Sequence, residues 1–444
     1  MTLHDARGEA LSTDQDAALA LYEQSLDLFN SLRMDPVAAL QPALEMDADF
    51  ISGHLLMAGL MLSAIDAQAL PQARDSLAAA AAAASRREPT LRERSLLAAL
   101  QPWAEGDMGR ANRLLDRHLI DHPRDLFALQ LTHMGDLVLG QSILLRDRVG
   151  RVLAHWSPAD AGYGYVLGMH AFGLEECNEY ARAEAAAEAA LERNPFDAWA
   201  VHALAHVYEM QGRAEDGIRW LTEGNTHWQQ DNMLAVHNWW HLALQHLRAD
   251  DTASALAVYD RAIAPNGNSM ALDLVDASAL LWRLQLRGVH AGAVRWEALA
   301  ARWREWAQPG WSTFNDMHAL LAQIGAGSAE GIALLRAAMG VVHADAAPAP
   351  WWRHAGVAAD AMQAFGDARY DDCARELLPL LHAAQGYGGS HAQRGIFHLT
   401  ACEAARRAGD RALHEALCSE AAARLPATRE AAEAMPRRAQ LKAA

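Results

Sequence analysis

A repeated helix–turn–helix pattern in the middle of the chain is the feature that most constrains the fold. Each copy has an apolar helical stretch, a polar turn, and a second helical stretch that opens with small residues. Aligning the turns places Asn178, Gly212 and Asp250 in register, with steps of 34 and 38 residues. The longer step implies an insertion of four residues near "QDNML". The three copies are Tyr165–Asp197, Ala198–Leu221 and Val236–Ile263.

The period of this pattern identifies a known kind of repeat. Two helices in about 34 residues are typical of the tetratricopeptide repeat. In the first copy, Ala183, Ala190, Leu191 and Pro195 stand where that repeat has small, small, large and proline residues. Weaker copies on both sides bring the expected total to roughly ten to twelve, each burying its apolar face by stacking on its neighbours.

We therefore predict an all-α protein: a tetratricopeptide-repeat-like α-solenoid in which helix pairs wind into a right-handed superhelix. The breaks in the pattern are short and contain Gly and Pro, which indicates loops between helices and not linkers. The prediction is a single continuous solenoid over residues 1–444, with the best-defined central repeats at 164–263. Residues 436–444 are predicted to fray.

Composition excludes several classes of partner. The formal charge is −17, from 38 basic and 55 acidic residues. The sequence has no stripe of basic residues, so we do not expect a nucleic-acid partner. The sequence has no apolar run of about 18 residues, so we do not expect a membrane span. The N-terminus does not have the pattern of a secretory signal. The four cysteines form no C-x-x-C pair, which favours a reduced, cytoplasmic setting.

Two histidine pairs stand out within the central repeats. His202 and His206 are one helical turn apart and are followed after another turn by Glu209; His237 and His241 repeat the same spacing. At about 100° per residue, the first pair and Glu209 lie about 115° from the centre of their helix's apolar stripe. Neighbouring first helices of such repeats line a concave surface, so we expect all four imidazoles to face one closed or deep groove.

Four converging imidazoles allow three interpretations. They can hold a divalent metal such as zinc, iron or manganese, with Glu209 as a further ligand or a base. They can also form an acid–base or anion-binding site, because imidazole donates and accepts protons near neutral pH. The third interpretation is structural: polar residues hydrogen-bonded between helices.

Two further stretches carry weaker candidates. "FNDMHALLA" places Asp316 and His318 near a helix start, where Asn315 or Asp316 is also a candidate N-cap. "GGSHAQRG" places Arg394 beside a helix N-terminus, which suits an anion; the alternative is that Ser390 caps the helix and Arg394 pairs with an acid.

Together these stretches resemble the tetratricopeptide repeat protein 38 family. The resemblance spans roughly residues 123–397 and rests on "HALAHVYEMQGRAEDG", "HNWWHLAL", "FNDMHALLA" and "GGSHAQRGIF". It implies the repeat architecture and a polar inner surface, and it names no substrate. The positions that match the family's pattern are His133, Arg146, Asp147, His202, His206, Glu209, His237, Asn238, His241, Asn315, Asp316, His318, Gln393 and Arg394.

The sequence thus leaves two functional hypotheses. In the first, the groove binds a small molecule or a peptide end, through ligand-binding residues His133, Asn238, Trp240, Gln393 and Arg394. In the second, the protein is a hydrolase-type enzyme that uses a metal or proton transfer in the same groove. Its metal ligands are His202, His206, His237 and His241, and its catalytic groups are Glu209, Asp316 and His318.

Overall fold

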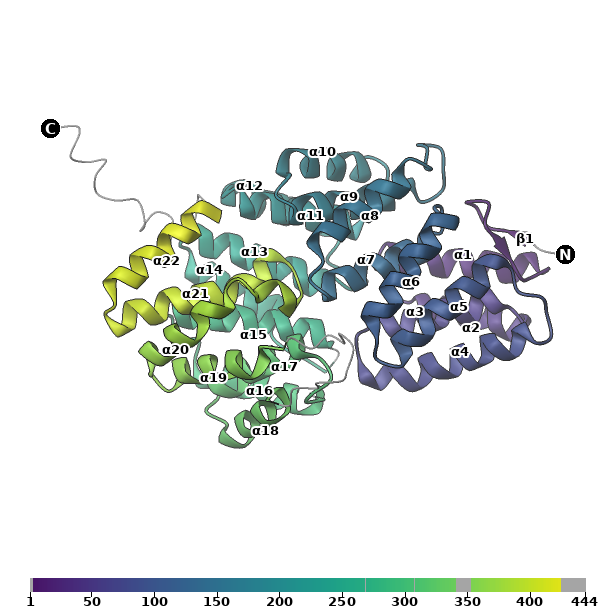
Figure 1. Ribbon diagram of the computed structural model, residues 1–444. Helices are drawn as coiled ribbons and strands as arrows, with labels where there is room; N and C mark the ends of the chain where they lie inside the picture. Colours follow the sequence, from purple (N-terminus) through teal and green to yellow (C-terminus); the bar gives the residue numbers. More distant parts are fainter. Residues whose placement is uncertain (1–2, 268, 307, 341–352, 425–444) are drawn as a thin grey trace. The chain divides into compact units, whose positions relative to one another are not determined.

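The chain is an all-α helical solenoid in which helices pack in succession (Figure 1). The computed structural model describes residues 3–267, 269–306, 308–340 and 353–424, so the predicted fraying of residues 436–444 lies outside the described residues. Its contacts divide it into two compact units. Described residues of the first unit lie within Met1–Ala203 and His227–Ala235.

The first unit consists of helices and one small antiparallel sheet that pairs Leu3 with Leu11. The strands are β1 (Leu3–His4) and β2 (Ala10–Leu11), and the helices are α1 (Asp16–Asn30), α2 (Pro36–Met46), α3 (Ile51–Ser63), η1 (Ala67–Ala69), α4 (Leu70–Ala84), α5 (Leu91–Ala104), α6 (Met108–Asp121), α7 (Leu126–Val138), α8 (Ser142–Leu153), α9 (Tyr163–Glu176) and α10 (Tyr180–Leu191).

The second unit begins inside α11 (Ala198–Met210), at Leu204, and takes in nearly all the later helices. These are α12 (Ala214–Glu223), α13 (Ala235–Arg248), α14 (Thr252–Val258), η3 (Tyr259–Ile263), α15 (Ala271–Leu286), α16 (Ala293–Trp306), α17 (Thr313–Gly325), α18 (Ala329–Met339), α19 (Ala355–Gly366), α20 (Tyr370–Leu377), η4 (Leu378–Leu380), η5 (Ala384–Tyr387), α21 (His391–Ala408) and α22 (Arg411–Arg424); η2 (Asn225–His227) precedes α13.

The turns within helix pairs share one backbone geometry. Asn178, Gly212 and Asp250, aligned from sequence, all have a left-handed φ, between 59° and 68°. The residue after each donates its amide to the carbonyl five residues earlier, as Arg213 does to Tyr208 at 2.8 Å. This is the Schellman arrangement, which satisfies the last carbonyls of a helix. All eleven pairs, from α1–α2 to α21–α22, have such a left-handed residue between their helices.

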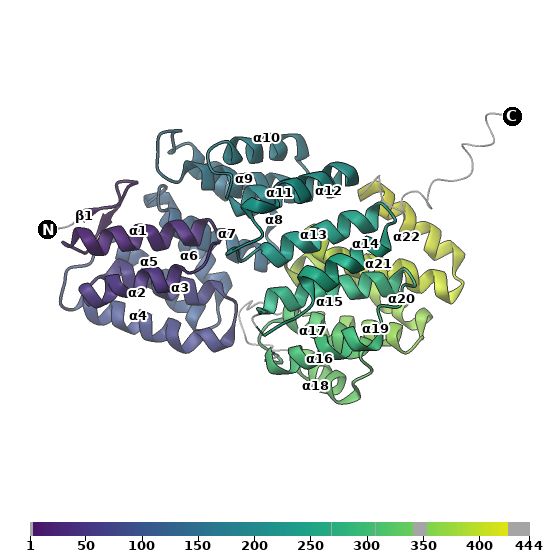
Figure 2. The ribbon, with the colours of Figure 1, turned by 180° about the vertical axis from the view of Figure 1, so that it is seen from behind.

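First helices of successive pairs lie side by side, as the solenoid interpretation requires. In the first unit α3 packs on α5 and α7 on α9; in the second, α15 packs on α17, α17 on α19, and α19 on α21. The last of these helices also returns to the first of them, since Trp282 of α15 donates to Thr400 of α21 at 3.0 Å. Both ribbon views show α13 beside α15 (Figures 1 and 2). The inner faces of the second unit are therefore packed against one another.

Other sequence predictions concern cysteines and membranes. None of the four cysteines forms a disulfide, and Cys373, Cys402 and Cys418 are buried. Among the described residues, no helix combines the length and the apolar character needed to cross a bilayer. The contact-based division does not test the predicted continuity over residues 1–444, which stays a prediction.

Candidate metal centre

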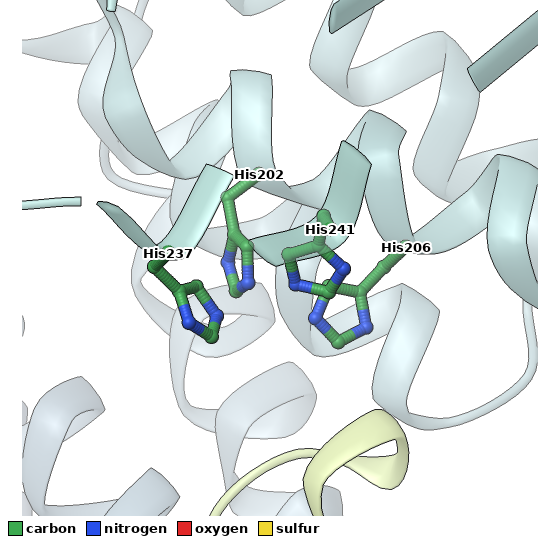
Figure 3. Close-up of side chains that lie close together, drawn as sticks. All are labelled: His202, His206, His237 and His241. Atoms are coloured by element: carbon green, nitrogen blue, oxygen red, sulfur yellow. The ribbon is translucent and has the colours of Figure 1, made fainter. Parts of the chain in front are cut away.

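Four histidine side chains from two helices lie close together. His202 and His206 are one turn apart in α11, and His237 and His241 are one turn apart in α13. Each offers a ring nitrogen, and these four atoms all lie within 4.8 Å of one another. Figure 3 shows the four imidazoles gathered in one place. The predicted convergence of the two pairs is confirmed.

Two carboxylates orient the histidines of α13. Nδ1 of His237 donates to both carboxylate oxygens of Asp276 in α15, at 2.9 and 3.0 Å. Nδ1 of His241 donates to Oε2 of Glu209 in α11, at 3.1 Å. Because a neutral imidazole carries its proton on one nitrogen only, these bonds leave the lone pair on Nε2. Histidine ligands of metals usually have such a carboxylate on the opposite nitrogen.

Burial favours the form of histidine that binds metal. The exposed fractions of the four side chains range from 0% for His206 and His241 to 4% for His237. Burial lowers the pKa of His241 well below its usual value, and the nearby charges of His206 and His237 lower it further. The neutral imidazole is the metal ligand, so burial stabilises the form of His241 that coordination needs.

The spacing of the rings suits a single ion after a small inward shift. Zn–N bonds are about 2.0–2.1 Å long, so two nitrogens on one ion lie at most about 4.2 Å apart. The four nitrogens of this cluster lie within 4.8 Å of one another, so binding one ion requires the rings to move inward. Of the three metals considered from the sequence, imidazole donors favour zinc and iron, because manganese prefers oxygen ligands.

Trp240 and Asn238, predicted from sequence to bind ligand, are both fully buried in α13. Trp240 stacks on His237 at a centroid distance of 5.2 Å and meets His241 edge-on at 4.9 Å, so it forms one wall of the cluster. The side-chain amide of Asn238 has no hydrogen-bond partner among the described residues. A buried polar group without a partner costs about 1–3 kcal/mol, which marks Asn238 as a place for a water molecule or a ligand.

Sequence reasoning missed three charged residues around this cluster: Asp276, Arg248 and Arg283. Arg248 donates to Oε1 of Glu209 at 3.2 Å, so Glu209 is bonded on both oxygens. The guanidinium of Arg283 lies over the ring of Trp240, 5.4 Å from its centroid. Asp276 and Arg283 belong to α15, the first helix of the next pair. The sequence indicated only that this helix adjoins α13, and not which of its residues reach the histidines.

Asp316 and His318 are buried at the start of α17, in the second unit. The prediction that Asn315 or Asp316 caps this helix is wrong, because Ser312 is the N-cap and accepts from the Asn315 amide. Asp316 instead accepts the Gly310 amide at 2.8 Å. Burial raises the pKa of Asp316 to about 7 and lowers that of His318 to about 4. Their catalytic roles stay predictions.

The residues of "GGSHAQRG" are used mainly in building α21. Ser390 is the N-cap, as one interpretation expected, and Gln393 completes the capping box by accepting the Ser390 amide at 2.9 Å. Arg394 donates to the carbonyl of Gly389. In the first unit, Arg146 pairs with Asp147 and also with Glu179 of the next helix pair, at 2.8 Å. Ligand binding by Gln393 and Arg394 stays a prediction.

His133 is buried in α7 of the first unit, edge-on to Trp199 at 4.8 Å. Neither ring nitrogen has a hydrogen-bond partner among the described residues. Burial lowers the pKa of His133 to about 3, and the charge of Arg148 adds to the effect. The structure therefore gives His133 the surroundings of an apolar aromatic side chain.

His133→Phe is expected to make the protein less sensitive to acid. A folded-state pKa of about 3 against an ordinary value of about 6.5 means that stability is complete above pH 6.5 and falls as the pH decreases toward 3. Between pH 7 and pH 5 this one group should cost about 2 kcal/mol in unfolding free energy. Urea unfolding at both values should show that much less loss in the variant. An equal loss, as expected for a control such as exposed His155→Phe, would contradict the assignment.

A scan against protein-family models found no match to this chain. Membership of the tetratricopeptide repeat protein 38 family therefore stays a prediction from the quoted motifs. The structure itself shows a helical-repeat fold and a histidine cluster able to hold a metal ion.

Proposed function

We propose that this chain is a helical-repeat protein of the tetratricopeptide repeat protein 38 kind that binds one divalent transition metal ion at His202, His206, His237 and His241. One observation carries the proposal: four imidazole nitrogens lie within 4.8 Å of one another, and carboxylates hold the Nδ1 atoms of His237 and His241. Carboxylates that orient two rings, and so leave the lone pairs on Nε2, are expected of metal ligands and not of polar residues clustered by chance.

The proposal includes a ligand at the metal. Zinc with four protein ligands is commonly closed and structural, whereas iron or cobalt with four imidazoles has room for further ligands. We infer that the bound ion takes a small molecule or the end of a peptide, the binding function expected from sequence. Asn238, whose buried amide has no partner among the described residues, supports a polar ligand or water near α13.

An enzymatic role is the second candidate, favoured by Asp316. Its pKa of about 7 suits proton transfer at neutral pH better than that of an ordinary carboxyl group. Glu209 is less suited to act as a base, because His241 and Arg248 already occupy its two oxygens. A metal-dependent hydrolase remains the specific form of this hypothesis.

Metal titration of the purified, chelator-treated protein tests the proposal. Wild-type protein is expected to bind one equivalent of zinc or cobalt(II), and Asp276→Asn to bind it about 10–100-fold more weakly. The reason is that the neutral amide of Asn holds the His237 ring less firmly than the carboxylate of Asp276 and lacks its negative charge. Isothermal titration calorimetry gives both stoichiometry and affinity.

Asp273→Asn is the matched control, since Asp273 lies one turn earlier in α15 and accepts the Met270 amide instead of a histidine. Its metal affinity should change much less than that of Asp276→Asn, because Asp273 acts on His237 only through its charge. Failure of the folded wild-type protein to bind either metal would refute the proposal.

A further inference from the structure

Arg283 is a deeply buried charged residue of the second unit. Its side chain lies in α15 and only 5% of the residue is exposed. It donates to the carbonyls of Ala279, at 3.1 Å, and of Ala392. Among the described residues it forms no ion pair with a carboxylate. Since a guanidinium has five N–H donors and a buried charge is costly without compensation, Arg283 has capacity for an anion.

The two carboxylates whose charges act on Arg283 are hydrogen-bonded to other residues. Glu209 is bonded to His241 and Arg248, and Asp276 to His237, although both act on Arg283 through their charge. When the imidazoles are neutral, the positive charges of Arg248 and Arg283 equal in number the negative charges of Glu209 and Asp276. A divalent ion on the histidines would add two positive charges to this buried region. An anion would then restore the balance, and low polarity would make its attraction strong.

Trp240 connects the two positive sites. His237 stacks on it at 5.2 Å, His241 touches its edge at 4.9 Å, and the guanidinium of Arg283 lies over its ring at 5.4 Å. The indole thus borders both the proposed metal and the guanidinium. The charge of Arg283 also acts on buried His318, whose Nε2 atom has no hydrogen-bond partner among the described residues.

We propose that Arg283 and the ion held by the four histidines together bind the carboxylate group of a small organic molecule, beside Trp240. This rests on the proposed function and names its ligand class. The planar guanidinium matches a carboxylate through two parallel hydrogen bonds. A single buried arginine suits one negative charge better than the higher charge of a phosphate. The burial of the surrounding side chains restricts the ligand to a slender end, such as an acetyl-sized acid.

The experiment uses cobalt(II)-loaded full-length protein and acetate as the probe. Visible absorption of the bound cobalt reports any added ligand, and calorimetry gives the affinity. Acetate is expected to bind the loaded wild type, and at least about tenfold more weakly to Arg283→Lys, which keeps the charge but loses the bidentate geometry. Removing the cobalt from the wild-type protein should also weaken acetate binding by at least about tenfold. Phosphate, titrated in parallel, should not bind at these concentrations.

Arg287→Lys is the matched control, because Arg287 follows Arg283 by one turn as the C-cap of α15 and pairs with Asp250 instead. It should bind acetate as the wild type does. Equal acetate affinity in wild type and Arg283→Lys, with cobalt bound one to one in both, overturns the inference and leaves the metal site intact. Preference for phosphate overturns the carboxylate assignment.

Two results need no variant. Acetate affinity that is the same with and without cobalt overturns the inference, even where Arg283→Lys does not fold. Absence of cobalt binding refutes the proposed function itself, and this inference falls with it.

Discussion

His241→Ala is expected to weaken zinc or cobalt(II) binding by roughly 10²–10³-fold. Zinc sites with four ligands bind with about 10–16 kcal/mol, so one ligand accounts for roughly 3–4 kcal/mol of that total. His241 is the most constrained of the four, since it is fully buried, is bonded to Glu209, and contacts the rings of both His206 and His237. Competition with a chelator of known affinity measures the change.

The best control for this variant lies on the same helix. His246 follows His241 in α13, is partly exposed, and pairs with Asp251 outside the cluster. His246→Ala should therefore keep the wild-type affinity. Thermal unfolding without metal shows whether His241→Ala still folds. A folded variant that binds zinc as tightly as the wild type would exclude His241 as a ligand and would contradict the proposed centre.

The sequence predicted the repeats and the neighbouring helices well because these depend on local chemistry. A left-handed turn residue favours Gly, Asn or Asp, and those residues at 178, 212 and 250 reveal the helix pairs directly. The i, i+4 spacing of His202 and His206 likewise fixes their common side of one helix. Both predictions follow from a single stretch of chain.

The missed residues depend on contacts between repeats. Asp276 reaches His237 across 39 positions, and Arg283 reaches Trp240 from the same helix. A repeat period tells which helices adjoin, but not how far each is rotated about its own axis. The error at α17 has a similar cause: the Asp316 carboxylate is drawn to the Gly310 amide in the preceding loop, and Ser312 caps the helix.

The largest stability effect is expected in the first unit, at Asp125. Its carboxylate accepts from Arg92 at 2.6 and 3.1 Å and from Nε2 of His118 at 2.9 Å, and it also caps α7 through the Ala128 amide. Arg92 and Asp125 are almost completely buried. Asp125→Ala should lower the unfolding free energy by about 3–5 kcal/mol, because it leaves a buried guanidinium without its counter-charge. Urea unfolding at pH 7 measures this loss.

The pH dependence identifies the ion pair as the cause. Burial alone would raise the pKa of Asp125, but Arg92 and His118 lower it below its usual value. The carboxylate therefore stabilises the fold above about pH 4, and this contribution is lost as the pH falls through the lowered folded-state pKa. The difference between wild type and Asp125→Ala should be constant from pH 7 to about pH 5 and shrink in stronger acid.

Removing both charges separates pairing from packing. Arg92→Met/Asp125→Leu leaves no uncompensated ion, so it should be clearly more stable than Asp125→Ala, as buried pairs replaced by apolar residues often are. Asp49→Ala, which breaks the exposed Arg86–Asp49 pair, should leave the unfolding midpoint unchanged. If the double variant were no more stable than Asp125→Ala, the loss would come from packing or from the α7 cap, and the buried charge would not be its source.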